Sequence, residues 1–171
     1  FVIAHAYDQR LAGGLSLGGF MRLRAVRLYP LFALGMILAT MKGVAGLALG
    51  FPDVPPAGQL GLAVGLGMLC LPTPIVGAVM FLNVPAWSLF FEAVANAAYA
   101  AAHRFMTVRA LSAVVAVSLC GVVWMASRGT LDVGYRWPEL AEGFFRVGFS
   151  FPLGVLLYRL RPRLPAVHPM A

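Results

Sequence analysis

Charged side chains are scarce in this sequence. They make up 11% of its 171 residues, whereas 61% are hydrophobic; soluble domains carry about 25% charged residues. A soluble fold of this length could not bury so much apolar surface, so we expect the lipid bilayer to surround most of the chain. The net charge of +7 is spread between hydrophobic runs, as membrane topology requires, which argues against nucleic acid as a partner.

Motifs for disulfide, metal and hydrolase chemistry are also missing. Cys70 and Cys120 each lie alone in an apolar run, which excludes a disulfide framework and favours buried packing. The sequence contains no HxxxH, no CxxC and no Gly-rich phosphate loop. The stretch GLSLG at 14–18 matches the letters GxSxG, but it follows no strand and so is not a nucleophile elbow. We therefore expect neither a metal site nor a serine hydrolase, and no permanently bound cofactor.

Apolar runs of about the length that crosses a bilayer recur along the chain. After a helical stub at 1–7 and a Gly-rich, increasingly basic connector at 8–26, we expect membrane segments at 28–49, 59–82, 86–103, 111–126 and 143–160. This pattern predicts an all-α, polytopic transmembrane helix bundle of about four to five segments, in a single membrane-embedded domain over 1–171. Because the chain starts at Phe1 and ends without a closing helix, we expect a domain that is incomplete at both ends.

Basic residues set the expected orientation of these segments. The regions that should face the cytoplasm are 22–27, 103–109 and 159–163, and those that should face outward are 52–56 and 128–142. Two simple crossings at 59–82 and 86–103 would place Arg104 outside. We expect 59–82 to be the one that fails to cross, because Pro72 and Pro74 interrupt it. The alternative is that a weakly basic loop breaks a statistical rule.

A lone carboxylate, Glu92, lies in the middle of the apolar stretch NVPAWSLFFEAVANAAYA. On a helix, one polar face would hold Ser88, Glu92, Asn96, Tyr99 and His103. An ionisable group at mid-membrane costs at least ~2.5 kcal/mol and normally faces a partner or a wet cavity. A structural hydrogen bond between helices, the alternative explanation, gains only about 0.6 kcal/mol. We therefore expect Glu92 to face the bundle interior and to serve a site.

Arginines stand at two membrane boundaries. In FMRLRAVRLYP, Arg22, Arg24 and Arg27 could bind phosphates through paired hydrogen bonds. On physical grounds alone, topology anchoring or lipid headgroup contact explains them better. Arg146 lies one turn inside the last segment, where it could pair with Glu142, snorkel to the interface or serve a site.

Two of these stretches, RLRAVRLYPLFALGMILA and LNVPAWSLFFEAVANAAYA, resemble the membrane-bound acyltransferase 3 family. Arg24 and Arg27 match that family's RxxR pair, and its PAWSLxxE motif is matched by Trp87, Ser88 and Glu92. This chain has FFEA where the family more often has SVEE. FVIAHAYDQRLAGG and EGFFRVGFSFPLGVLLYRL resemble the family's second helix and its later Arg-Phe-Gly helix, so the resemblance covers nearly the whole chain.

The resemblance implies an integral membrane O-acyltransferase, in a bacterial cytoplasmic membrane. It would move an acyl group, commonly acetyl, from acyl-coenzyme A to a hydroxyl of a carbohydrate or lipid-linked glycan. The implied substrate-binding residues are Arg22, Arg24, Arg27, Trp87, Ser88, Asn96 and Arg146, with the first three on the donor's phosphates.

Glu92 would support catalysis, because the family's histidine belongs to a first helix expected before Phe1. C-terminal helices are also expected to be missing, and the fragment should be inactive alone. The alternative is a non-enzymatic transporter or channel fragment, which the polar stripe and the Pro-interrupted segment would also fit.

Overall fold

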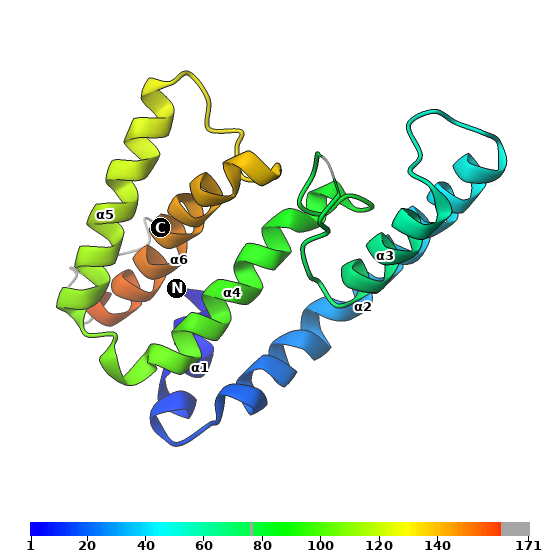
Figure 1. The fold of residues 1–171 in the computed structure, drawn as a ribbon. Coiled ribbons are helices and arrows are strands. Elements are labelled where there is room, and N and C mark those ends of the chain that lie inside the picture. The colour runs from blue at the N-terminus through cyan, green and yellow to red at the C-terminus, as the bar shows by residue number, and fades with distance from the viewer. Residues whose placement is uncertain (76, 162–171) are drawn as a thin grey trace, which may run out of the picture.

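The computed structural model describes residues 1–75 and 77–161 (Figure 1). Its helices are α1 (Val2–Ala12), α2 (Leu17–Ala48), α3 (Ala57–Met68), α4 (Trp87–Ala102), α5 (Val108–Ser127) and α6 (Leu140–Leu160). Three stretches are long and apolar enough to cross a membrane: α2, α5 and Trp137–Leu160, which contains α6. The expected all-α membrane bundle is confirmed, with α3 and α4 as its shorter segments.

Helix α2 begins much earlier than expected, at Leu17. The prediction of a connector through residue 26 was wrong: Gly13 and Gly14 form a turn, but Gly18 and Gly19 already lie inside a helix. Ser16 caps the helix by accepting a hydrogen bond from the Gly19 amide at 3.1 Å, which satisfies one of the free donors of the first turn. Phe20 and Arg24 are buried on this part of α2, and that packing offsets the low helix propensity of glycine. The three arginines at 22–27 are consequently fixed on a helix.

The segment at 59–82 does not cross the membrane as one helix, as predicted. Helix α3 has 12 residues and spans roughly 18 Å, well short of a hydrocarbon core of about 30 Å. It ends before Cys70, whose φ of 55° is left-handed, and before Leu71, whose position ahead of Pro72 disfavours helical backbone. The chain then leads back to the start of α4 (Figure 1).

The returning chain is tied to the loop that precedes α6. The Val79 amide donates to the Tyr135 carbonyl at 2.7 Å, and Trp137 Nε1 donates to the Thr73 carbonyl at 2.8 Å. In Figure 1 these loops and the turn after α2 lie toward the upper end, whereas the α1–α2 and α4–α5 connections lie at the lower end. This arrangement agrees with the expected placement of the basic α4–α5 connection opposite the loops at 52–56 and 128–142.

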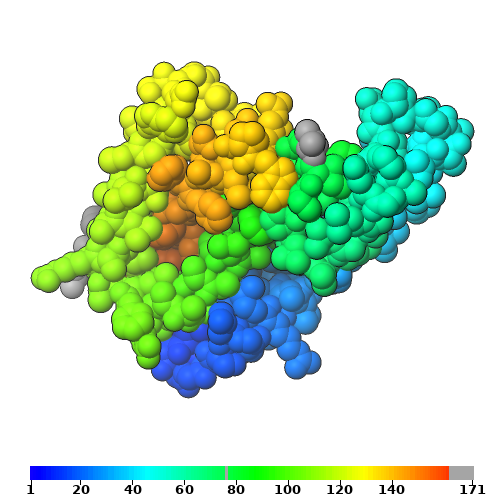
Figure 2. Space-filling view, in the orientation of Figure 1, coloured from blue at the N-terminus to red at the C-terminus, as the bar shows by residue number. Residues whose placement is uncertain are grey.

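Helices α5 and α6 form an antiparallel hairpin beside α4 (Figure 1). Gly121 permits their close approach, because a Cβ atom at this position would lie 2.4 Å from the Phe145 ring. In the space-filling view, the later part of α6 is recessed between α5 and α4 (Figure 2).

Two hydrophobic clusters hold α2 against its neighbours. The lower cluster includes Phe20 of α2 and Tyr99 of α4, both fully buried. The upper cluster includes Phe32 of α2 and Ala86 at the start of α4. The stretches of α2 and α4 between these clusters carry polar side chains, so polar groups are enclosed between two apolar layers.

Asp8 joins three elements at the lower end of the bundle. Its Oδ1 accepts hydrogen bonds from the Tyr99 hydroxyl at 2.7 Å and from the Arg159 guanidinium at 2.8 Å, and lies 3.1 Å from His103 Nε2. Asp8 lies outside the three candidate spans. Burial raises the pKa of this carboxyl, but the hydrogen bonds from Arg159, Tyr99 and His103 outweigh burial and leave the pKa below its usual value. The ionised carboxylate therefore fastens α1 to α4 and α6.

We predict that Asp8→Asn lowers the stability of the folded protein at neutral pH by about 1–2 kcal/mol, a charged hydrogen-bond contribution reduced by partial exposure. Because the folded-state pKa is lowered, the wild-type contribution is present above the unfolded pKa of about 3.9 and is lost as the pH falls through the lower folded value. Thermal unfolding of the detergent-solubilised protein between pH 7 and pH 3 measures both effects. The exposed Asp132→Asn is the matched control, and identical unfolding curves for the two variants would contradict the prediction.

Candidate functional site

An ion pair between α2 and α4 forms the centre of the candidate site. The Arg24 guanidinium lies 2.5 Å from Glu92 Oε1, and the two side chains are 7% and 38% exposed. Arg24 is about two turns into α2, roughly 10 Å along its axis. The prediction that Glu92 turns inward is confirmed, as is the choice of the arginine-bearing helix as its partner. Its role in a reaction stays a prediction.

The first turns of α4 fix the position of Glu92. Pro85 lies in the 3-10 turn Val84–Ala86 that leads into α4, and the Ser88 hydroxyl donates to the Pro85 carbonyl at 3.2 Å. One turn after Glu92, the buried Asn96 side chain donates from Nδ2 to the Glu92 carbonyl at 2.9 Å. Asn96 therefore supports the backbone under the carboxylate, while its Oδ1 is buried without a hydrogen-bond partner in the described part of the chain.

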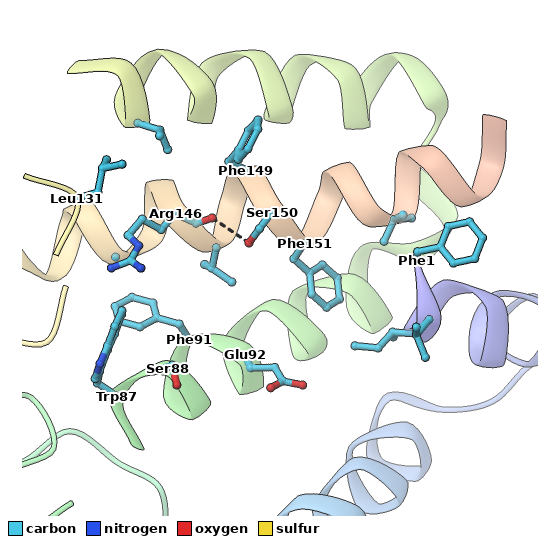
Figure 3. Close-up of a pocket in the computed structure, with 16 residues that line it drawn as sticks. Phe1, Trp87, Ser88, Phe91, Glu92, Leu131, Arg146, Phe149, Ser150 and Phe151 are labelled. Carbon is cyan, nitrogen blue, oxygen red and sulfur yellow. Dashed lines mark hydrogen bonds between the residues drawn. The ribbon is translucent and has the colours of Figure 1, made fainter. Parts of the chain in front are cut away.

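Glu92 borders a cavity of about 720 Å³ that lies between α4, α5, α6 and the start of α1 (Figure 3). Trp87, Ser88 and Glu92 line it from α4, and Arg146 lines it from α6. Most of the remaining wall is apolar, including side chains at the start of α1 and along α6. The cavity thus combines a few convergent polar groups with a largely apolar lining, which is the usual composition of a small-molecule site.

Arg146 points from α6 toward Trp87 (Figure 3). Its NH1 donates to the Val133 carbonyl at 3.0 Å, and its guanidinium carbon lies 5.2 Å from the centre of a Trp87 ring. Of the three alternatives for Arg146, the ion pair with Glu142 is not formed: among the ion pairs of residues 1–75 and 77–161, Arg146 has no carboxylate partner. The backbone carbonyl and the aromatic face hold the guanidinium against the cavity and away from its own helix.

The three arginines of α2 do not act as one cluster. Arg24 is buried and engaged with Glu92, whereas Arg22 and Arg27 are exposed. Neither exposed arginine lines the cavity. The structure therefore brings together Arg24, Glu92, Asn96, Ser88, Trp87 and Arg146, and leaves Arg22 and Arg27 on the surface of α2.

Sequence reasoning missed two residues that shape the cavity. Phe91 does not belong to the polar face that contains Ser88 and Glu92, yet it lines the cavity beside Glu92. Gly143 of α6 faces it, since a Cβ atom at this position would lie 2.3 Å from the Phe91 ring. No sequence signal pairs a glycine with a distant aromatic residue, so this contact could be found only in the folded structure.

The groups at the site permit binding and proton handling more readily than metal chemistry. In the part of the chain that the structure describes, no group of three or more His, Cys, Asp or Glu residues is placed to hold a metal ion. The polar inventory is two guanidinium groups, one carboxylate, one amide and the hydroxyls of Ser88 and Ser150. Such a site can orient a hydroxyl and bind an anion.

We predict that Gly143→Ala disturbs the cavity wall. The added methyl group must displace the Phe91 ring, which packs edge-on against Trp87 and Phe144 with centroid separations of 5.7 and 4.9 Å. Overpacking of this kind typically costs about 1–3 kcal/mol. Thermal unfolding should show the loss, and tryptophan fluorescence should shift.

The control for this change is Gly65→Ala, where the added atom meets open space and helix propensity favours alanine. Phe91→Leu in the Gly143→Ala background should recover part of the loss, because the smaller side chain relieves the contact. If Gly143→Ala is as stable as Gly65→Ala, the tight approach of α6 to Phe91 does not exist.

Comparison with known proteins gives one informative relative. A protein of Rhizobium radiobacter described as "Protein 2 in picA locus" is 38% identical over 130 residues, covering 69% of this chain and 68% of the relative. No protein-family model matches the chain, and no solved structure matches it. The relative's description gives a genetic locus and no activity. At this identity and coverage, the chain belongs to the same family as protein 2 of the picA locus.

Proposed function

We propose that this protein is a membrane-bound acyltransferase of the bacterial cytoplasmic membrane. It transfers an acyl group, with acetyl as the first candidate, from acyl-coenzyme A to a hydroxyl of a carbohydrate or lipid-linked glycan. The observation that carries the proposal is the Arg24–Glu92 ion pair. It joins the two stretches that resemble the acyltransferase 3 family, and it places their carboxylate at a cavity large enough for a substrate.

The reaction needs a group that accepts a proton from the acceptor hydroxyl. The hydroxyl oxygen then attacks the thioester carbonyl, the C–S bond breaks, and coenzyme A leaves as the thiol after taking up a proton. General-base assistance to such a step is worth typically 10²–10⁴-fold. The ion pair with Arg24 fixes the position of the Glu92 carboxylate, so Glu92 can orient the base or the acceptor hydroxyl. In the acyltransferase 3 family that this chain resembles, the base itself is a histidine of the first helix.

The donor's phosphates require cations that are not already neutralised. Arg24 is engaged with Glu92, so we assign donor binding to the exposed Arg22 and Arg27 and give Arg24 the task of holding the carboxylate. Both exposed arginines lie in the first half of α2, toward the end of the bundle that also carries the basic α4–α5 connection (Figure 1). A guanidinium can form two parallel hydrogen bonds with a phosphate group.

The transporter alternative is less well supported by the position of the interrupted segment. In many transporters, interrupted helices form the substrate site itself. Here the cavity is lined from α1, α4, α5, α6 and the loop at Leu131, while α3 packs along α2 (Figure 1). The polar groups and the interrupted helix therefore lie in different parts of the protein, as an enzyme with a fixed cavity allows.

We predict that Glu92→Gln reduces acyl transfer by roughly 10²-fold or more, because the side chain keeps its shape but loses its charge. The assay follows radiolabel from [acetyl-¹⁴C]acetyl-coenzyme A into the glycan and lipid fractions of membranes that contain the full-length parent protein. Glu139→Gln is the matched control, since this carboxylate pairs with Arg136 outside the cavity. Equal activity in the two variants would remove Glu92 from the site.

The exchanged variant Arg24→Glu/Glu92→Arg separates a catalytic from a structural role. Exchange restores an ion pair between α2 and α4, so membrane insertion and thermal stability should largely recover relative to either single change. Acyl transfer should not recover, because the carboxylate then belongs to α2 and no longer to the cavity wall of α4. Recovery of full activity would mean that the pair is structural only.

We also predict that Arg22→Ala and Arg27→Ala raise the KM for acetyl-coenzyme A. Each hydrogen bond to a charged group is worth about 1.5–3 kcal/mol, which corresponds to about 10- to 100-fold. Lysine at either position should rescue only partly, because paired hydrogen bonding is lost. Arg128→Ala, an exposed arginine after α5, is the control. An unchanged KM together with altered membrane orientation would identify Arg22 and Arg27 as topology anchors.

A further inference from the structure

The charges around the cavity do not balance. Glu92 is neutralised by Arg24, whereas Arg146 on the opposite wall has no carboxylate partner among the described residues. A cation at membrane depth is costly and normally finds an opposite charge or water. Arg146 therefore presents a positive charge to a largely apolar cavity without a direct ion-pair partner among the described residues.

The structure holds this charge in place. Arg146 uses one N–H on the Val133 carbonyl and lies over Trp87, which restricts the guanidinium plane to one orientation. A guanidinium has five N–H donors, so this single hydrogen bond leaves others available to a ligand. A flexible surface arginine would lose more conformational freedom on binding than this one.

The position of Arg146 separates it from the proposed donor site. Arg146 contacts the loop at Val133, which lies toward the upper end of the bundle, whereas the first half of α2 with Arg22 and Arg27 lies toward the lower end (Figure 1). Arg146 and Glu92 both line the cavity, from α6 and from α4 (Figure 3), whereas Arg22 and Arg27 lie outside it. A substrate bound at Arg146 would thus approach the carboxylate from within the cavity, apart from the donor's phosphates.

We propose that Arg146, held by Val133 and Trp87, binds an anionic group of the acceptor, so that the acceptor is an acidic or phosphorylated sugar and not a neutral one. The identification of this anion as part of the acyl acceptor rests on the proposed acyl transfer. Anion binding at Arg146 does not depend on that proposal. Carboxylate and phosphate share the geometry that a guanidinium recognises, and the two sources are distinguished by separate probes.

The test measures binding to the full chain in lipid nanodiscs by calorimetry, without acyl donor. The probes are glucuronate, glucose 6-phosphate and glucose. Wild-type protein should bind at least one charged sugar at least tenfold more tightly than glucose, and 0.5 M sodium chloride should weaken that binding. Preference for glucuronate identifies a carboxylate site and preference for glucose 6-phosphate a phosphate site. Equal binding of all three sugars, or of none, overturns the proposal.

Arg146→Gln should abolish the preference for the charged sugar, and Arg146→Lys should retain part of it. Arg136→Gln is the matched control, because Arg136 is an exposed arginine of the same loop region outside the cavity. If Arg146→Gln does not fold, the proposal is still tested by whether the wild-type protein binds a charged sugar more tightly than glucose. Charged-sugar binding without any acyl transfer would refute the proposed function and leave this inference standing, whereas acyl transfer to neutral sugars alone would do the reverse.

Discussion

A buried guanidinium cannot be left without an opposite charge, and the packing of α2 against α4 satisfies this requirement at one point. Arg24 is almost fully buried, so its charge must be met by Glu92 or remain unpaired at a cost of several kcal/mol. Hydrophobic contacts alone would let the two helices slide or rotate. The ion pair, enclosed between the Phe20 and Phe32 clusters, selects one register, and the position of the cavity on the other side of α4 follows from it.

The remaining charges of the interior are arranged around that pair. At the lower end, Asp8 contacts Tyr99, His103 and Arg159 through hydrogen bonds. These contacts fix α1, whose first residues line the cavity beside α6. Arg146 is held near the upper loops by a carbonyl and an aromatic ring. Two of these three groups are therefore ion-paired within the described chain and hold helices together, whereas Arg146 has no ion-pair partner among the described residues.

The sequence was informative where one residue type has one physical consequence. Apolar length predicted the helices, Pro72 predicted the interruption after α3, and the cost of an isolated charge predicted that Glu92 turns inward.

Predictions failed where a contact with a distant part of the chain decides the local structure or the partner of a side chain. The Gly-rich start of α2 is helical because Phe20 and Arg24 are buried by other helices. Among the alternatives left open for Arg146, distant contacts with Val133 and Trp87 are formed instead of the local pair with Glu142. Local spacing contains no information about such distant partners.

The division of the arginines on α2 shows how one helix can serve two purposes. Residues three apart on an α-helix differ by about 60° around its axis, so Arg24 and Arg27 are neighbours that need not share an environment. Packing of α4 on one side of α2 buries Arg24 and leaves Arg27 exposed. A single short motif then supplies one paired charge to the interior and two exposed charges to the surface. In the proposed acyl transfer, this separation would leave the exposed arginines for the donor's phosphates while Arg24 holds the carboxylate.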